Sequence, residues 1–116
     1  MIETTLIRYL NEKLEVEAYA EYPENAPEQF VLIEKTGGGG SSKLSKATIA
    51  LQSYADDLLD AMKLNETVKE VMDELPWELD GVTSSKYNTD YNFTDTSTRK
   101  YRYQAVYDIT YYKEDV

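Results

Sequence analysis

The chain has 116 residues, with 22 acidic and 12 basic side chains and a formal net charge of −10. This length predicts a single domain that buries about two thirds of its unfolded surface. The sequence has no cysteine and no histidine, which excludes disulfides, thiolate metal sites and the commonest acid–base side chain. The acidic balance argues against tight nucleic-acid binding, because phosphate contacts need concentrated cations.

Neither a membrane span nor a signal peptide is expected from the sequence. No run of about 18 apolar residues is present, so we expect no transmembrane helix. The first residues, 1–6, lack the basic and apolar regions of a signal peptide. Together with the missing cysteines, this indicates a cytoplasmic site of synthesis.

The N-terminal third of the chain predicts one helix and two strands. Residues 2–13 form an amphipathic helix in this interpretation, because apolar side chains recur at helical spacing: Ile2, Leu6, Tyr9 and Leu10. Alternating apolar and acidic residues predict a strand over 16–22, which ends at Pro23 because proline removes a backbone donor. Residues 29–35 are apolar on both faces and predict a central strand.

Glycine and serine dominate the segment that follows. Residues 36–45 contain four consecutive glycines, and we predict a flexible surface loop that is mobile in the free protein. The segment looks like a phosphate-binding loop only superficially, because no glycine directly precedes the Lys-Ser/Thr pair that such a loop needs. Alternation over residues 47–52 then predicts a third strand.

A long helix is predicted after this strand, with Ser53 as its N-cap. It carries two apolar stripes, one formed by Ala55, Leu58, Leu59 and Met62, the other by Val68, Val71, Met72 and Leu75. The stripes are offset by roughly 140° around the helix, so one straight helix cannot bury both against one sheet. We therefore predict a kink or restart at residues 63–66, with Asn65 or Thr67 as the new cap and an end at Pro76.

The C-terminal quarter predicts two closing strands. Residues 82–93 and 100–112 are joined by a polar turn, and seven of the eleven tyrosines lie in residues 87–112. We expect the odd-numbered face of the last strand to pack under the helix at Leu58, Leu59 and Met62; this face comprises Tyr101, Tyr103, Ala105, Tyr107 and Ile109. The complete order, α-β-β-β-α-β-β with a kinked second helix, predicts one α+β domain over residues 1–116, with helices packed on a mostly antiparallel sheet.

We find no catalytic or cofactor-binding motif in the sequence. Glu24, Glu34 and Lys35 approximate a nuclease pattern, but Lys35 directly follows Glu34 and points to the opposite strand face. The helical region carries carboxylates of the type that bind a hard cation. We interpret them as a solvated face: Asp56, Asp57, Asp60, Glu66, Glu70, Asp73 and Glu74. We therefore predict a structural protein with no catalytic residue, cofactor or metal.

The order of five segments resembles the tail completion, or tail terminator, proteins of long-tailed phages and prophages. These segments span most of the chain and comprise residues 30–37, 47–55, 64–69, 91–96 and 101–109. The resemblance implies a hexameric ring that caps the head-proximal end of the phage tail tube, stops tube polymerisation and docks to the head connector. It places the protein in the virion tail, after assembly in the host cytoplasm.

The same resemblance implies a set of partners and an interface. The partners are further copies of this chain, the major tail tube protein and the head–tail connector protein, with DNA passing through the lumen without specific binding. We expect subunit contacts at sheet edges and at the glycine-rich segment. The candidate interface residues are Gly37, Gly38, Gly39, Gly40, Lys43, Arg99, Lys100 and Arg102.

Two other classes of function remain open at this point. One is a small α+β regulatory module that binds a ligand or a protein, and the other is a small enzyme that uses only carboxylates and tyrosines. A ring-forming protein assembles in solution, whereas a monomeric ligand binder does not, so a size-exclusion profile discriminates between the first class and the tail terminator.

Overall fold

A computed structural model describes residues 1–41, 43–97 and 100–116 of the chain. Its elements in chain order are α1 (Ile2–Lys13), β1 (Ala18–Tyr19), β2 (Phe30–Gly40), β3 (Leu44–Ala55), α2 (Leu58–Asp73), α3 (Leu75–Glu78), β4 (Val82–Asn92), β5 (Tyr101–Tyr112) and a terminal 3-10 turn, η1 (Lys113–Asp115).

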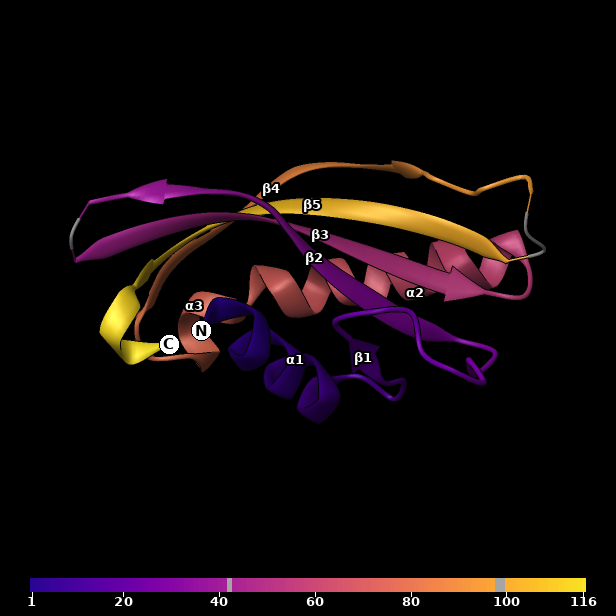
Figure 1. Cartoon of the computed structure of the whole chain (residues 1–116), viewed down its shortest axis with the longest axis horizontal. Coiled ribbons are helices and arrows are strands. Elements are labelled where there is room, and N and C mark those ends of the chain that lie inside the picture. The colour runs from indigo at the N-terminus through magenta and orange to yellow at the C-terminus, as the bar shows by residue number, and fades with distance from the viewer. Residues whose placement is uncertain (42, 98–99) are drawn as a thin grey trace.

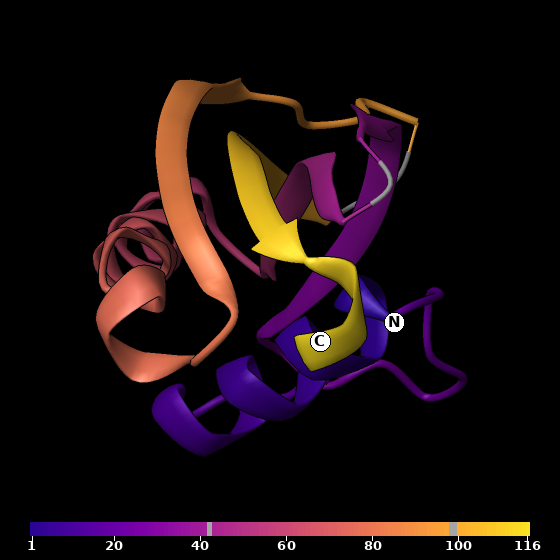
Figure 2. The same ribbon diagram turned by 90° about the vertical axis from the view of Figure 1, so that its left-hand side faces the viewer.

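The five strands form one sheet in the order β1-β2-β3-β5-β4. Strand β1 pairs with β2 in parallel, and every other neighbouring pair is antiparallel. Figure 1 shows α1 and α2 beneath the sheet, and the end-on view of Figure 2 shows how strongly the sheet curves. This arrangement confirms the predicted α+β fold class.

The core lies between the helices and the odd-numbered positions of β3 and β5. The pairs Ala47–Ile109, Ile49–Tyr107 and Leu51–Ala105 stand opposite each other across these strands, and all six side chains are buried. They join one apolar cluster with α1 and α2, whose members include Leu6, Leu10, Val68 and Met72. Because side chains alternate between the faces of a strand, the odd positions point to the helices and the even positions point away.

Tyr107 connects the sheet to α2 through its hydroxyl. The ring is fully buried, and the hydroxyl donates to the carboxylate of Asp73 at 2.7 Å and approaches the carbonyl oxygen of Lys69 at 3.1 Å. Burial, followed by the hydrogen bond to Asp73, raises the pKa of Tyr107 well above its usual range. The hydroxyl therefore stays protonated and keeps its role as a donor.

The prediction for the last strand is confirmed for the residues in the middle of its odd-numbered face, but the helix residues predicted to cover them are wrong. Ala105, Tyr107 and Ile109 are buried as expected, but Tyr101 at the strand's start is exposed. The helix residues expected above them are exposed: Leu58 by 36%, Leu59 by 58% and Met62 by 40%. The side chains of α2 that are buried are Ala61, Leu64, Asn65, Val68 and Met72.

A later helix start explains this error. Ser53 and Ala55 belong to β3, and the N-cap is Asp57, whose carboxylate accepts from the backbone N–H of Asp60 at 2.8 Å. From this start, a single stripe at helical spacing covers the buried face, so no kink is needed. The predicted restart at residues 63–66 is wrong, because α2 runs uninterrupted to residue 73.

The extents of β1 and β3 also differ from the predictions. The strand predicted over residues 16–22 shortens to Ala18–Tyr19, because the side chain of Asn11 accepts from the backbone N–H of Ala18 and the ring of Tyr22 turns onto Phe30. Strand β3 extends the predicted 47–52 at both ends. The predicted bounds of β4 and β5 are confirmed to within one residue.

The predicted end of the second helix is wrong in detail. Helix α2 ends at Asp73, three residues before the proline expected to end it. Pro76 stands in the first turn of the short helix α3, where a missing backbone N–H leaves no helical hydrogen bond unmade.

Truncation of Ile109 tests which face of β5 is inside. We expect Ile109→Ala to lower the free energy of unfolding by about 2–5 kcal/mol, because the side chain is 1% exposed and its loss leaves a cavity. The matched control is Leu59→Ala on the exposed face of α2, expected to change it by less than about 0.5 kcal/mol. Denaturant melts of dilute protein measure both, and the reverse ranking would contradict this core.

Candidate functional site

The structure does not bring the candidate interface residues together. Gly40 stands opposite Ser45 at one end of the β2–β3 pair, whereas Arg102 stands opposite Tyr54 near the other end of the sheet. The molecule is 43 Å long in its longest direction. Gly37–Gly40 and Lys43 therefore lie at one end, Lys100 and Arg102 lie at the other, and Arg99 falls outside the described residues.

The glycine end is part of a strand and not the loop predicted for residues 36–45. Strand β2 continues to Gly40 through an irregularity between Lys35 and Gly37, and residues 37–40 pair with 48–45 of β3. The prediction of a loop beginning at residue 36 is therefore wrong. Glycine has little strand propensity of its own, so the pairing comes from the neighbouring strand.

The outer edge of β2 is open over most of its length. Strand β1 pairs only with Val31 and Leu32, and Val31 donates its N–H to the carbonyl of Glu17 at 3.0 Å. Because backbone groups alternate along a strand, the N–H and C=O of Ile33 face the same outer side. The register Tyr19↔Leu32 extends the pairing with β1 to the N–H of Ile33, and no strand in the described part of the chain pairs with this side of residues 34–40.

Two of the glycines differ sharply in what they tolerate. Gly40 has a φ of +109°, and a Cβ there would lie 2.3 Å from the carbonyl oxygen of Leu44. A Cβ on Gly39 would meet nothing within 4 Å. The hairpin therefore needs glycine at position 40, whereas it leaves free space above position 39.

We expect Gly40→Ala to lower the free energy of unfolding by about 1–3 kcal/mol, because alanine is strained at this φ and its Cβ meets backbone. The matched variant Gly39→Ala is expected to stay within about 1 kcal/mol of the parent. Thermal or denaturant melts of both variants measure the difference. Equal effects of the two substitutions would show that the hairpin geometry described here is wrong.

At the opposite end, an aromatic cluster covers the face of the sheet without helices. The rings of Phe30 and Tyr54 stack with centroids 4.6 Å apart, and Tyr22 meets both edge-on. Arg102 lies with its guanidinium 4.3 Å from the ring centroid of Phe93 and donates to the hydroxyl of Tyr54 at 3.0 Å. This contact combines a cation–π interaction with a hydrogen bond.

Both basic candidates at this end have partners within their own chain. Lys100 donates to the carboxylate of Asp56 at 2.7 Å and to the carbonyl oxygen of Pro27 at 3.3 Å. Arg102 also donates from Nε to the carbonyl oxygen of Phe93 at 2.6 Å. These two cations therefore hold loops against the sheet in addition to any contact with a neighbour.

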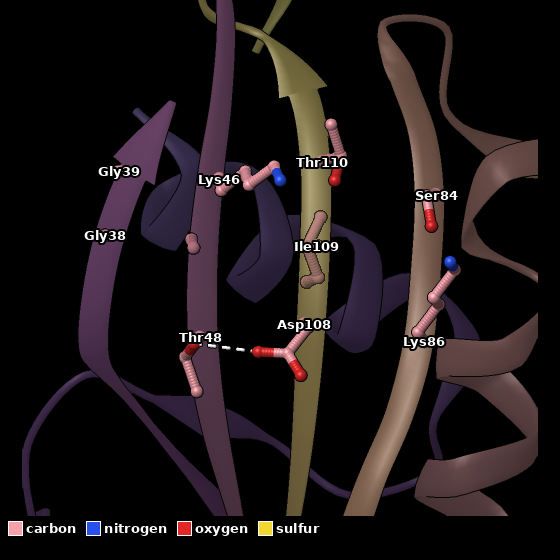
Figure 3. Close-up of a pocket in the computed structure, with 10 residues that line it drawn as sticks. Gly38, Gly39, Lys46, Thr48, Ser84, Lys86, Asp108, Ile109 and Thr110 are labelled. Atoms are coloured by element: carbon pink, nitrogen blue, oxygen red, sulfur yellow. Dashed lines mark hydrogen bonds between the residues drawn. The ribbon is translucent and has the colours of Figure 1, made fainter. Parts of the chain in front are cut away.

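A groove crosses the even-numbered face of the central strands. It has a volume of about 410 Å³, and its lining residues come from β2, β3, β4 and β5 (Figure 3). Two cations line it: Lys86 on β4 stands opposite Asp108, and Lys46 on β3 stands opposite Thr110. The two carboxylate oxygens of Asp108 accept from Thr48 at 2.8 Å and from Asn88 at 2.9 Å. The groove thus presents cations on an otherwise acidic protein.

The sequence analysis missed this groove. Its signal in the sequence is the recurrence of polar residues at the even positions of β5 and β3. The groove could not be predicted from this pattern, because the pattern does not give the strand register. The register places Thr48 and Lys86 on either side of Asp108.

A second polar cluster is centred on Asp90 of β4. Its carboxylate accepts from Lys69 at 2.9 Å, from the side-chain amide of Asn65 at 2.8 Å and from the hydroxyl of Tyr87. Burial raises the pKa of Asp90, but these hydrogen bonds and the charge of Lys69 outweigh it and hold the pKa below its usual value. Lys69 also pairs with Glu66 at 2.9 Å.

This depressed pKa predicts a loss of stability in acid. A carboxylate whose pKa is lower in the folded state stabilises the fold above its unfolded pKa of about 3.9, and this contribution disappears as the pH falls through the folded value. We expect Asp90→Asn to lower the free energy of unfolding by about 1–3 kcal/mol near neutral pH, because Lys69 loses a largely buried partner. The difference in the free energy of unfolding between the variant and the parent should become smaller below about pH 4, as measured by denaturation at a series of acidic pH values. A constant difference would contradict the assignment.

Neither a metal centre nor a membrane span is found within residues 1–41, 43–97 and 100–116. In these ranges, no group of three or more His, Cys, Asp or Glu side chains is arranged to hold a metal ion. Among the same residues, no helix has the length and apolar character needed to cross a bilayer.

Comparison with known proteins gives no assignment. No protein-family model matches the chain, and a search of curated proteins also gives no match.

Proposed function

We propose that the chain is the ring-forming subunit of a phage tail terminator. In this role it is a structural protein of the virion and not an enzyme. It caps the head-proximal end of the tail tube, stops tube polymerisation and offers a docking surface to the head connector. The proposal is supported by the ordered resemblance of residues 30–37, 47–55, 64–69, 91–96 and 101–109 to that family.

The open edge of β2 is the observation that carries the proposal. Unpaired N–H and C=O groups on a strand edge are a template for another chain, and proteins usually cover or blunt such an edge. The edge at residues 34–40 is long and ends in four glycines, whose missing side chains let a neighbouring backbone approach closely. A ring subunit needs such an edge on one side to receive its neighbour.

A ring built from identical copies also needs two different contact surfaces on each subunit, because each copy meets one neighbour on either side. The glycine end and the cationic end with Lys100 and Arg102 are chemically different and lie at opposite ends of the sheet. We propose that the major tail tube protein and the head connector meet the two flat faces of the ring. The net charge of −10 suits a lumen that repels DNA and lets it pass.

The alternative function is a small regulatory module that binds a ligand or a protein. The groove at Asp108, which Lys46 and Lys86 also line, is the observation that favours it. A ligand-binding module stays monomeric in solution, whereas a ring former assembles, so size-exclusion chromatography of the purified chain separates the two.

Deletion of the gene from a phage that carries it tests the tail-terminator proposal. We expect filled heads and unattached tails of abnormal length in electron micrographs of the lysate, because nothing then stops the tube or joins it to the head. Normal particles from the deletion strain would refute the proposal.

Complementation of this strain adds a matched pair of variants. Gly39→Ala should restore joined particles, because a methyl group fits the free space at this position. Gly39→Gln should fold equally well, since it meets no atom of its own chain at Cβ, but should fail to restore particles by filling the space that a neighbour approaches. Restoration by both variants would exclude the glycine end from the assembly contacts.

A further inference from the structure

The first two turns of α2 leave large apolar side chains in solvent. Leu59 is 58% exposed and Met62 is 40% exposed, although the same helix buries Val68 and Met72 completely. Exposed apolar clusters rimmed by polar groups commonly mark interaction sites. This stripe is the one that the sequence predicted to lie in the core, so the fold has left it without a partner.

The exposed stripe borders a cleft between α2 and the ends of β4 and β5. The cleft has a volume of about 500 Å³ and is lined by Leu59, Met62, Lys63, Asn65, Glu66, Lys69, Asp90, Tyr91 and Tyr103. Such a volume falls in the range of sites that hold one sizeable organic group. Apolar walls with a few polar groups at the base are typical of a pocket for an aromatic side chain.

An unpartnered acceptor lies among the residues that line this cleft. Asn65 is 1% exposed, and its side-chain amide N–H donates to Asp90. Its Oδ1 is buried without a hydrogen-bond partner in the described structure. A buried carbonyl oxygen without a donor lowers the stability of the fold. Asn65 Oδ1 can therefore accept a hydrogen bond from an incoming N–H group. The flexible side chains of Met62 and Lys69 must shift to admit it.

Trp77 is the most exposed large apolar side chain that the structure describes. It is 86% exposed on α3, between Pro76 and Glu78, while its neighbour Leu75 is buried and anchors the turn. Tryptophan is among the residues that contribute most to protein interfaces, and its indole N–H is a donor only. Figure 1 shows α3 at the opposite end of α2 from the strand ends that border the cleft.

We propose that Trp77 of one copy occupies the cleft beside Leu59 and Met62 of a second copy. The apolar ring fits the apolar walls, and the indole N–H supplies the donor that Asn65 Oδ1 lacks. The charges match as well, because Glu74 and Asp80 flank Trp77 in the sequence and are exposed. In the described part of the chain, Lys63 at the cleft is exposed and has no ion-pair partner.

This contact is head-to-tail, because the tryptophan and the cleft are different surfaces of the same chain. Repetition of a head-to-tail contact produces a closed ring if the rotation between copies closes, and a filament otherwise. The inference rests on the proposed function in that it takes neighbouring copies as the partners. It goes further by naming the side chain that docks and the site that receives it.

The chain contains a single tryptophan, so its fluorescence reports directly on the proposed contact. As the concentration of the wild-type chain rises, we expect oligomers in analytical ultracentrifugation and, in parallel, a blue shift of emission and protection from acrylamide quenching. Trp77→Ala should weaken association by roughly thirtyfold or more, as expected for an interface hot spot. Its unfolding midpoint should not change, because the ring is 86% exposed.

A mixing experiment tests the head-to-tail geometry. Leu59→Asp damages the cleft and keeps the tryptophan, whereas Trp77→Ala keeps the cleft and carries no tryptophan. Each variant alone should stay monomeric, and both should melt like the parent because both positions are exposed. Mixed together, they should form a one-to-one pair that grows no further, with a blue shift from the single fluorophore.

Three outcomes would overturn the proposed contact. Wild-type oligomers in which Trp77 stays quenchable would refute it and leave the ring proposal standing. A chain that stays monomeric with an exposed tryptophan at every concentration would refute a contact between copies, while the gene deletion decides the tail-terminator role independently. A blue shift seen only after addition of purified tail tube protein would assign the contact to that partner and not to a second copy.

Discussion

The antiparallel pairing of β3 with β5 is the constraint on which the rest of the structure depends. Its register runs without interruption from Leu44–Tyr112 to Ala55–Tyr101. A shift by one residue would move Tyr107 to the opposite face of the sheet, because side chains alternate along each strand. The helix would then lose its buried anchor and β4 would lose its partner positions. The faces of the whole sheet are therefore set by these two central strands.

The same register sorts the chemistry of the protein onto two faces. Odd positions pack against the helices in an apolar core, and even positions carry Thr48 and Asp108 on the other face. The helix-free face is held by aromatic stacking at one end, where Phe30 and Tyr54 meet, and is hollowed into a cationic groove at the other. The candidate surfaces are thus consequences of strand register and not of local sequence motifs.

Periodic segments could be predicted from the sequence, and tertiary effects could not. Strand β5 follows a clear alternation, so its bounds were predicted closely. The glycine hairpin could not be predicted, because its strand geometry comes from pairing with β3. The start of α2 was missed because Ser53 and Asp57 are both suitable caps, and only the extension of β3 decides between them. The cleft and Trp77 required the folded arrangement to be recognised.

The C-terminal end of α2 is fastened to the sheet and to α1 by hydroxyl groups. Backbone carbonyls of its last turns accept from Tyr107 at Lys69, from Tyr9 at Val71 and from Ser85 at Met72. No comparable set of bonds holds the carbonyls of its first turn, among the described residues. Local opening of this helix should therefore be graded along its length, with amide exchange fastest at the first turn and slowest near the last. The first turn, which places Leu59 beside the cleft, is then the part of the helix most free to adjust when another surface arrives.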